Sequence, residues 1–168
     1  FYATCDGGVN GIDRNGKKLW NVQLPGRIFS TPTYHDGLVI VGCADNALYA
    51  LSASNGETVW KVETEKSVLC SPAGLGNTVY FGASDGKFRA VDVRDGSEVW
   101  TFDGVEGFVE GRPWVDQEQV VFGAWDRKLY SLDSKTGKLM WVWTVDKGSK
   151  MYSPAATWPV KSCGHIFI

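Results

Sequence analysis

The stretch that decides the fold is SLDSKTGKLMW, residues 131–141. It recurs upstream as AVDVRDGSEVW at 90–100, as ALSASNGETVW at 50–60 and, one residue shorter, as GIDRNGKKLW at 11–20. A tryptophan closes each copy and a glycine precedes it by four residues: Trp20, Trp60, Trp100 and Trp141, with Gly16, Gly56, Gly96 and Gly137. The tryptophans are 40, 40 and 41 residues apart, and a fixed period of this length indicates a tandem structural repeat.

Two further markers share the period. A proline recurs at Pro32, Pro72, Pro113 and Pro154, and an aspartate at Asp6, Asp45, Asp85 and Asp126. Each aspartate falls next to Gly, Asn, Arg or a similar turn residue, so we expect it to cap a hairpin turn and not to form a ring of metal ligands. The tryptophan, glycine, proline and aspartate therefore share one period, which is not expected by chance.

Each unit is predicted to form four short antiparallel strands. In the third unit the first strand is expected to run through the Ser-Pro step, at 68–74. The others are expected at 79–83, 88–92 and 98–102, where β-branched and aromatic residues alternate with Gly, Asn and Asp turns. We find no helical periodicity in the chain.

A four-stranded unit repeated every 40 residues is typical of a propeller blade, because one blade cannot cover both of its faces but radially packed neighbours can. We predict an all-β protein, a β-propeller or part of one, with about four four-stranded antiparallel blades in a single segment, 1–168. The units are expected at approximately 1–26, 27–64, 65–104 and 105–146, with 147–168 beginning a further blade.

The two ends fall at the same phase of the repeat, and both resemble cuts through a longer protein. Three arrangements fit: an arc of a larger ring, which we favour, two copies that complete a ring, or four blades that close alone. Exposed blade faces at the ends would favour self-association.

Composition excludes several partners. The 17 Lys and Arg against 19 Asp and Glu give a net charge of −2, and no basic run occurs. A nucleic acid is therefore not an expected partner. No apolar stretch has the length of a membrane span. The four cysteines form no Cys-x-x-Cys pair, which argues against zinc and leaves their disulfide state open: Cys5, Cys43, Cys70 and Cys163.

The recurring segments resemble the tryptophan-docking repeat of pyrroloquinoline-quinone-type propellers, Ala-x-Asp-x-x-Thr-Gly-x-x-x-Trp. Residues 131–141 match it nearly, 90–100 lack only the Thr, and 50–60 also lack the Asp. The resemblance implies a propeller fold and a location outside the cytoplasm, in the periplasm or at the cell surface. The family includes quinone-dependent dehydrogenases, an outer-membrane assembly scaffold lipoprotein, and accessory domains of kinases and phosphoesterases.

The resemblance does not extend to the enzymes' machinery. The dehydrogenases hold the quinone with calcium, a catalytic Asp and a disulfide between adjacent cysteines, and this chain has no Cys-Cys pair. The two histidines, His35 and His165, have no nucleophile or metal ligand at a recognisable spacing. We therefore expect no catalytic site and no cofactor, and a binding or scaffold module for a protein, a peptide or a glycan. The alternative is a piece of a larger enzyme, either a quinone dehydrogenase or an accessory domain.

The third interval departs most from the repeat and supplies the candidate site. Arg112 precedes Pro113 where the other units have Thr31, Ser71 and Ser153. With Glu110, Trp114 and Trp125 around it, Arg112 is predicted to bind an anion or a partner's carboxylate. The alternative is that Arg112 pairs with Glu110 or Asp126. The repeated tryptophans are expected to pack between blades, whereas Trp114, Trp125, Trp143 and Trp158 lie off the repeat and could form an aromatic surface.

Overall fold

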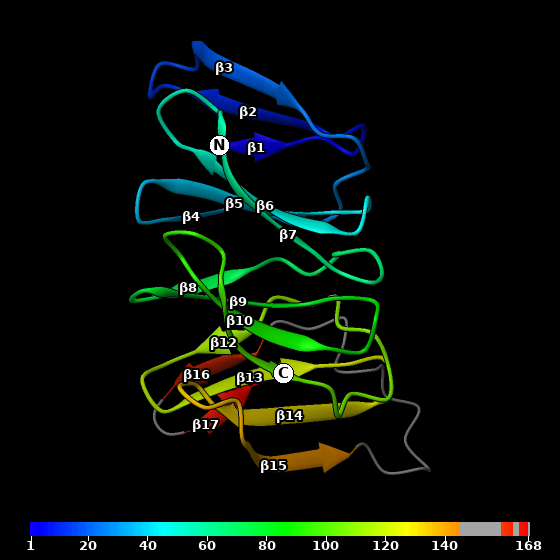
Figure 1. Ribbon diagram of the computed structural model, residues 1–168. Coiled ribbons are helices and arrows are strands. Elements are labelled where there is room, and N and C mark those ends of the chain that lie inside the picture. Colours follow the sequence, from blue (N-terminus) through cyan, green and yellow to red (C-terminus); the bar gives the residue numbers. More distant parts are fainter. Residues whose placement is uncertain (145–158, 163–164, 168) are drawn as a thin grey trace.

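The computed structural model describes residues 1–144, 159–162 and 165–167. Every regular element in this part of the chain is a β-strand, and the strands form antiparallel sheets that follow one another in chain order. Figure 1 shows the sheets stacked face to face, from β1–β3 at the top to β12–β15 at the bottom. The prediction of an all-β propeller segment with about four blades is confirmed.

The sheets have the strand orders β1-β2-β3, β4-β5-β6-β7, β8-β9-β10-β11, β12-β13-β14-β15 and β16-β17. Where one repeat unit ends and the next begins in the connecting loops stays a prediction. The strands are β1 (Tyr2–Ala3), β2 (Gly8–Ile12), β3 (Lys18–Gln23), β4 (Thr33–His35), β5 (Leu38–Cys43), β6 (Ala47–Ser52), β7 (Thr58–Glu63), β8 (Ala73–Leu75), β9 (Thr78–Gly82), β10 (Phe88–Asp92), β11 (Glu98–Phe102), β12 (Trp114–Val115), β13 (Gln119–Gly123), β14 (Lys128–Asp133), β15 (Leu139–Thr144), β16 (Val160–Ser162) and β17 (His165–Phe167).

The third and fourth strands of the third unit coincide with the predicted ranges, as β10 and β11. The first strand does not, because β8 begins only at Ala73, after the proline. Pro72 has no N–H to donate to a ladder, and it restricts the residue before it. The prediction of one strand over 68–74 was therefore wrong in its first half.

The segment before the proline bonds to the neighbouring sheets instead. The backbone N–H of Thr31 donates to Ser71 Oγ at 2.8 Å, and the thiol of Cys70 donates to the carbonyl oxygen of Gly111 at 3.0 Å. Thr33 Oγ1 likewise donates to the carbonyl oxygen of Pro72 at 2.6 Å. These bonds satisfy backbone groups that a continuous strand would have used, and they join one blade to the next.

Three of the four repeated tryptophans lie between adjacent sheets. Trp20, Trp60 and Trp100 are each less than 10% exposed. Each indole N–H donates to a backbone carbonyl of the following sheet's turn: Trp20 to Ala53 at 3.0 Å, Trp60 to Val93 at 2.7 Å, and Trp100 to Ser134 at 3.1 Å. Burial of the large ring and satisfaction of its only donor occur in one place.

The glycine of the following turn makes room for each indole. Gly96 has φ +74°, and a Cβ atom there would come within 2.9 Å of the Trp60 ring. Gly56 and Gly137 face Trp20 and Trp100 in the same way, at 2.6 Å. A side chain at these three positions would be strained by the backbone and would collide with the ring, whereas at Gly16 the positive φ of +80° alone favours glycine.

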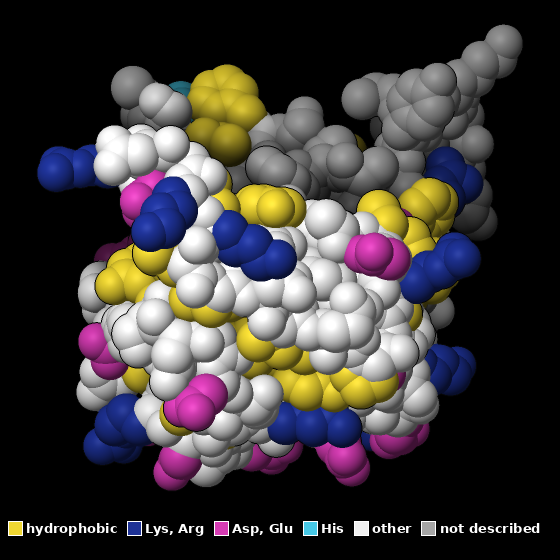
Figure 2. All heavy atoms as spheres, turned by 90° about the horizontal axis from the view of Figure 1, so that it is seen from above, with side chains coloured by type: hydrophobic (Ala, Val, Ile, Leu, Met, Phe, Trp, Pro, Cys, Tyr) yellow, Lys and Arg dark blue, Asp and Glu magenta, His cyan; other side chains and the backbone are white. Residues whose placement is uncertain are grey.

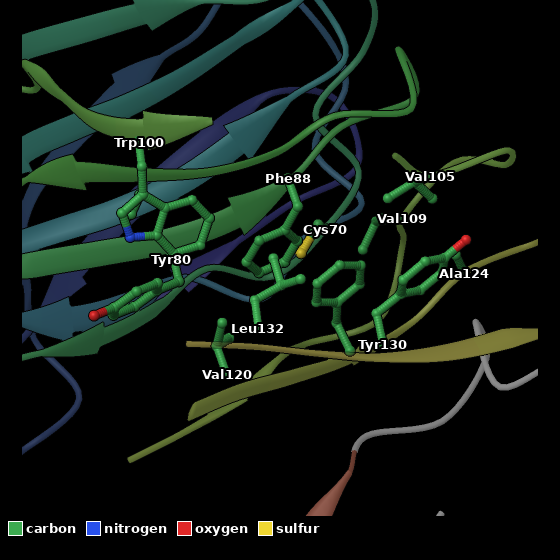
Figure 3. Packing of buried hydrophobic residues seen from close by; sticks show 12 residues of the cluster. Cys70, Tyr80, Phe88, Trp100, Val105, Val109, Val120, Ala124, Tyr130 and Leu132 are labelled. Carbon is green, nitrogen blue, oxygen red and sulfur yellow. The ribbon is translucent and has the colours of Figure 1, made fainter. Parts of the chain in front are cut away.

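Between the sheets the core is aromatic and β-branched (Figure 3). Phe88 of β10 stacks on Phe122 of β13 with ring centroids 3.9 Å apart and planes 2° from parallel. Phe122 in turn stacks on Tyr130 of β14. The faces of neighbouring sheets therefore cover each other, as the repeat required.

Two sheet faces carry exposed apolar side chains. On β15, Trp141 is half-buried, and Leu139, Met140 and Trp143 are exposed. Figure 2 views the molecule onto the first sheet, where hydrophobic side chains lie among lysines and arginines. Ile12 and Leu19 of that sheet are exposed. Trp158 lies outside the described residues.

Candidate functional site

The structure divides the four predicted binding residues between two places. Arg112 and Trp114 line a cavity. Glu110 and Trp125 instead form a hydrogen bond with each other, between the loop that precedes β12 and the β13–β14 hairpin. The sequence did not distinguish these two groups.

The cavity has a volume of about 360 Å³ and lies where β8, β12 and β16 come together. It is lined by Ala73, Gly74, Arg112, Pro113, Trp114, Val115, Pro159 and Val160. Its walls are formed by β8, β12 and β16, each of which is an edge strand of its sheet. Among the described residues that line the cavity, Arg112 supplies the one charged side chain.

Arg112 is half-buried, and none of the ion pairs among the described residues involves it. The two predicted alternative partners are engaged elsewhere. Glu110 Oε2 accepts a hydrogen bond from Trp125 Nε1 at 2.8 Å, and Asp126 accepts from the hydroxyl of Tyr130 and from the backbone N–H of Lys128. The Arg112 guanidinium is thus held in a cavity with no carboxylate of the described chain paired to it.

Cys70 lies close enough to Arg112 and Glu110 for their charges to act on its thiol. Burial raises the pKa of its thiol, a backbone hydrogen bond with Gly82 and the charge of Arg112 lower it, and the charge of Glu110 raises it, with a net pKa of about 12. The thiol is neutral at physiological pH, whereas the thiolate is the nucleophilic form. Cys5, Cys43 and Cys70 are free thiols, and Cys163 lies outside the described residues.

The second place is an aromatic pair that includes a residue the sequence analysis missed. Phe108 stacks on Trp125 with ring centroids 5.2 Å apart and planes 26° apart. The backbone N–H of Trp125 donates to the carbonyl oxygen of Phe108 at 3.0 Å. Alignment of the repeat would have shown Phe108, because Arg27 and Ser67 occupy the matching positions.

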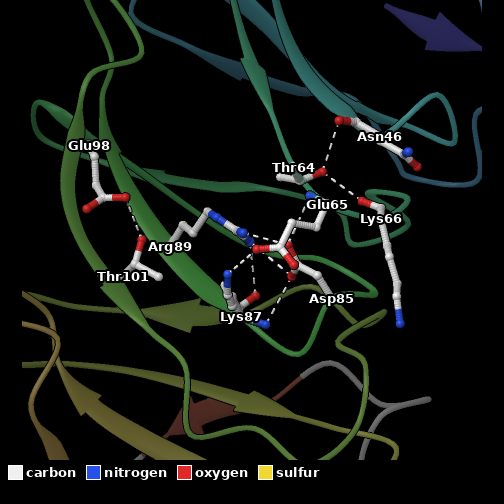
Figure 4. A network of polar contacts seen from close by, with 9 residues as sticks. All are labelled: Asn46, Thr64, Glu65, Lys66, Asp85, Lys87, Arg89, Glu98 and Thr101. Carbon is white, nitrogen blue, oxygen red and sulfur yellow. Dashed lines mark hydrogen bonds and ion pairs between the residues drawn. The ribbon is translucent and has the colours of Figure 1, made fainter.

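In the preceding sheet the same region carries a polar network (Figure 4). Arg89 donates from both terminal nitrogens to the Asp85 carboxylate, at 3.1 and 2.5 Å. Lys87 pairs with Glu65, which ties the β9–β10 hairpin to the loop that enters the sheet. Burial raises the pKa of Asp85, but the hydrogen bonds and charge of Arg89 outweigh it, so the pKa lies below the ordinary value of 3.8.

Three of the four recurrent aspartates, Asp6, Asp85 and Asp126, accept from a backbone N–H of their own turn, whereas Asp45 accepts from the hydroxyl of Tyr49. The Asp85 and Asp126 carboxylates each accept from the backbone N–H two residues on, at 3.0 Å. Across residues 1–144, 159–162 and 165–167, no three His, Cys, Asp or Glu side chains gather as a metal-binding group.

In the same ranges, no helix is long and apolar enough to cross a membrane.

Stacked antiparallel sheets with an indole docked between neighbours define the class of protein, a β-propeller built from tryptophan-anchored repeats. Residues 5–156 match the protein family described as outer membrane protein assembly factor BamB, and the chain belongs to that family.

Solved structures show the same relationship. BamB from Moraxella catarrhalis is 26% identical, with a TM-score of 0.74 over 86% of this chain and 44% of that one. The chain therefore spans less than half the length of that BamB. A quinohemoprotein alcohol dehydrogenase from Pseudomonas putida HK5 is 24% identical, with a TM-score of 0.66 over 74% of this chain and 22% of that one, a likeness of fold alone.

A curated relative matches a shorter segment. The beta-alanine-activating enzyme of Drosophila melanogaster is 46% identical over 52 residues, which are 29% of this chain and 5% of that protein.

Proposed function

We propose that this chain is a non-catalytic binding and scaffold segment of a propeller protein, and that it holds a partner protein through a carboxylate seated on Arg112. The observation that carries the proposal is the half-buried guanidinium in a cavity of about 360 Å³ with no ion-paired carboxylate among the described residues. BamB is named as an assembly factor of the outer membrane, which supports a protein partner and a location outside the cytoplasm. No cofactor enters the proposal.

The chemistry of Arg112 selects the ligand. A guanidinium that is partly removed from water is stabilised by an anion, and its planar fork matches a carboxylate with two parallel hydrogen bonds. Trp114 offers an apolar wall beside it. An acidic side chain or a chain terminus of a partner meets both requirements, whereas a neutral glycan would leave the charge uncompensated.

Short peptides test the site directly. A blocked tripeptide that ends in a free carboxylate should shift the NMR signals of cavity residues, and the same peptide ended by an amide should not. R112A should abolish the shift. R94A is the matched control, because Arg94 is an exposed arginine paired with Asp92 on another part of the surface. Equal binding of the two peptides, or unchanged binding by R112A, would contradict the proposal.

A second candidate is that the segment serves as an accessory part of a larger enzyme. The 52-residue match to an activating enzyme favours it, because that protein carries a related stretch within a much longer chain. The larger enzyme could also be a quinone dehydrogenase. Reconstitution of the segment with pyrroloquinoline quinone and calcium distinguishes an accessory segment from a part of such a dehydrogenase. A bound-cofactor absorption spectrum would support the dehydrogenase alternative, and its absence under saturating cofactor would argue against it.

We also propose self-association through the sheet faces that carry exposed apolar side chains. The exposed side chains of β15 include Leu139, Met140 and Trp143, and apolar surface of this kind marks an interaction site. Light scattering of the segment should show species larger than a monomer, and W143K should reduce them. A compact monomer at all concentrations would contradict this part of the proposal.

A further inference from the structure

One hairpin end of the molecule carries aromatic side chains where its equivalents carry small or polar ones. In three sheets a hairpin residue donates its backbone N–H to a carbonyl oxygen of the loop that enters the sheet. The pairs are Ala44 to Arg27 at 2.8 Å, Ser84 to Ser67 at 2.9 Å, and Trp125 to Phe108 at 3.0 Å. The fold forms this contact without rings in two of three cases, so the aromatic pair is not a requirement of the fold.

Both rings face outward although the chain beside them is fixed in the core. Val109 and Ala124, next to Phe108 and Trp125, are fully buried (Figure 3). Phe108 and Trp125 themselves face solvent, where they are 37% and 45% exposed. The two rings contact each other at the surface, so packing in the core of this chain does not account for their being aromatic.

The position of the Trp125 indole is set by three contacts. Its N–H donates to Glu110 Oε2 at 2.8 Å, one face stacks on Phe108, and its own backbone bonds to the Phe108 carbonyl oxygen. A ring held in this way loses little conformational freedom when a ligand binds, which raises affinity.

The groups offered at this surface select a cation. The indole has already used its only donor, so the rings present π faces, and the Glu110 carboxylate has acceptor oxygens only. The neighbouring carboxylate of Glu106 is paired with Lys128 at 2.7 Å. None of the ion pairs among the described residues involves Glu110. An anion would be repelled by the Glu110 carboxylate. A purely apolar ligand would remove that carboxylate from water without supplying a partner for its charge, which is unfavourable.

We infer that Trp125, Phe108 and Glu110 bind a positively charged side chain of a partner protein, with the guanidinium of arginine as the best fit. The guanidinium plane stacks on an indole face while its N–H groups donate to a carboxylate, and both interactions are available here at once. This site is separate from the Arg112 cavity and takes the opposite charge. A partner that carries an acidic and a basic group could therefore engage both.

The test uses a blocked Gly-Arg-Gly tripeptide and the ¹⁵N-labelled chain. Titration should shift the indole N–H signal of Trp125 with saturating, millimolar affinity. The citrulline tripeptide, which has nearly the same shape without the charge, and the glutamate tripeptide should leave that signal in place. E110Q keeps an acceptor for the indole but removes the charge, and it should weaken arginine binding about tenfold.

E57Q is the matched control, because Glu57 is an exposed carboxylate that accepts a hydrogen bond from the Asn55 side chain in a turn, at 2.7 Å. It should bind the arginine peptide as the native chain does. Citrulline binding equal to arginine, no shift with arginine, or unchanged affinity in E110Q would each overturn the inference. The Arg112 proposal is tested with carboxylate peptides and a different variant, so either site can fail alone.

Discussion

Trp60 and Trp125 both donate an indole N–H to an oxygen, yet they lie in contrasting surroundings. Trp60 is 7% exposed, and its acceptor is the backbone carbonyl of Val93 in the next sheet. Trp125 is 45% exposed, and its acceptor is the side chain of Glu110. A backbone acceptor is available in every copy of the repeat, whereas a side-chain acceptor depends on one residue.

The contrast separates indoles that hold the sheets together from an indole that is displayed. The first kind recurs with the period and fills the space over a glycine turn. The second kind departs from the period and is held at the surface beside a charge. Variants at the two positions should therefore affect different properties, stability in one case and binding in the other.

The largest effect is expected from W60A. It removes a buried ring and leaves the Val93 carbonyl oxygen without its donor, so it should lower the free energy of unfolding by about 3–5 kcal/mol. W125A, at the exposed ring, should stay within about 0.5 kcal/mol of the native chain. Urea unfolding followed by circular dichroism measures both, and similar losses in the two variants would remove the distinction.

The next effect concerns the glycine turn under the docked indole. G96A places a methyl group within 2.9 Å of the Trp60 ring at φ +74°, so strain and collision should together cost about 2–3 kcal/mol. G76A is the matched control, because Gly76 also has a positive φ, +56°, but a Cβ atom there meets nothing within 4 Å. It should cost about 1 kcal/mol from backbone strain alone. Equal losses would show that the Trp60 contact adds nothing.

A smaller, pH-dependent effect on stability is expected at the Asp85–Arg89 ion pair of the third sheet. The folded pKa of Asp85 lies below 3.8, so its contribution is fully present above pH 3.8 and is lost as the pH falls through the lower folded pKa. D85N should lower the free energy of unfolding by about 2 kcal/mol at neutral pH. The gap to the native chain should close in acid.

D92N provides the comparison for D85N, because Asp92 pairs with the exposed side chain of Arg94 on the surface. Surface ion pairs contribute little, so this variant should lose much less stability at neutral pH. A D85N deficit that persists unchanged below the folded pKa of Asp85 would assign the loss to packing and not to the charge.

The periodic features of the chain were the ones that the sequence could predict. Trp60 and Gly96 share one spacing with their equivalents, and that spacing was enough to predict a propeller of about four blades. β10 and β11 also fell where turn residues and alternation placed them. The start of β8 was missed because the inner segments bond between sheets, and such bonds leave no periodic pattern in one strand.

The candidate site was predicted less completely for a related reason. The departure of Arg112 from the repeat singled out this interval as a candidate, but sequence distance could not show that Glu110 turns toward Trp125 and not toward Arg112. Alignment with Arg27 and Ser67 singles out Phe108 as a departure from the repeat, but an aromatic residue in a chain rich in buried rings gives no sign of exposure. Its surface position follows from the entering loop and the hairpin together.

Hydrogen exchange of the indole N–H groups tests the central claim most directly, since each tryptophan reports on its own surroundings in one ¹⁵N experiment. The N–H groups of Trp20, Trp60 and Trp100 should exchange only when the sheets separate, and that of Trp125 should exchange orders of magnitude faster. Exchange of the Trp60 N–H at the rate of Trp125 would mean that the sheets are not joined by docked indoles.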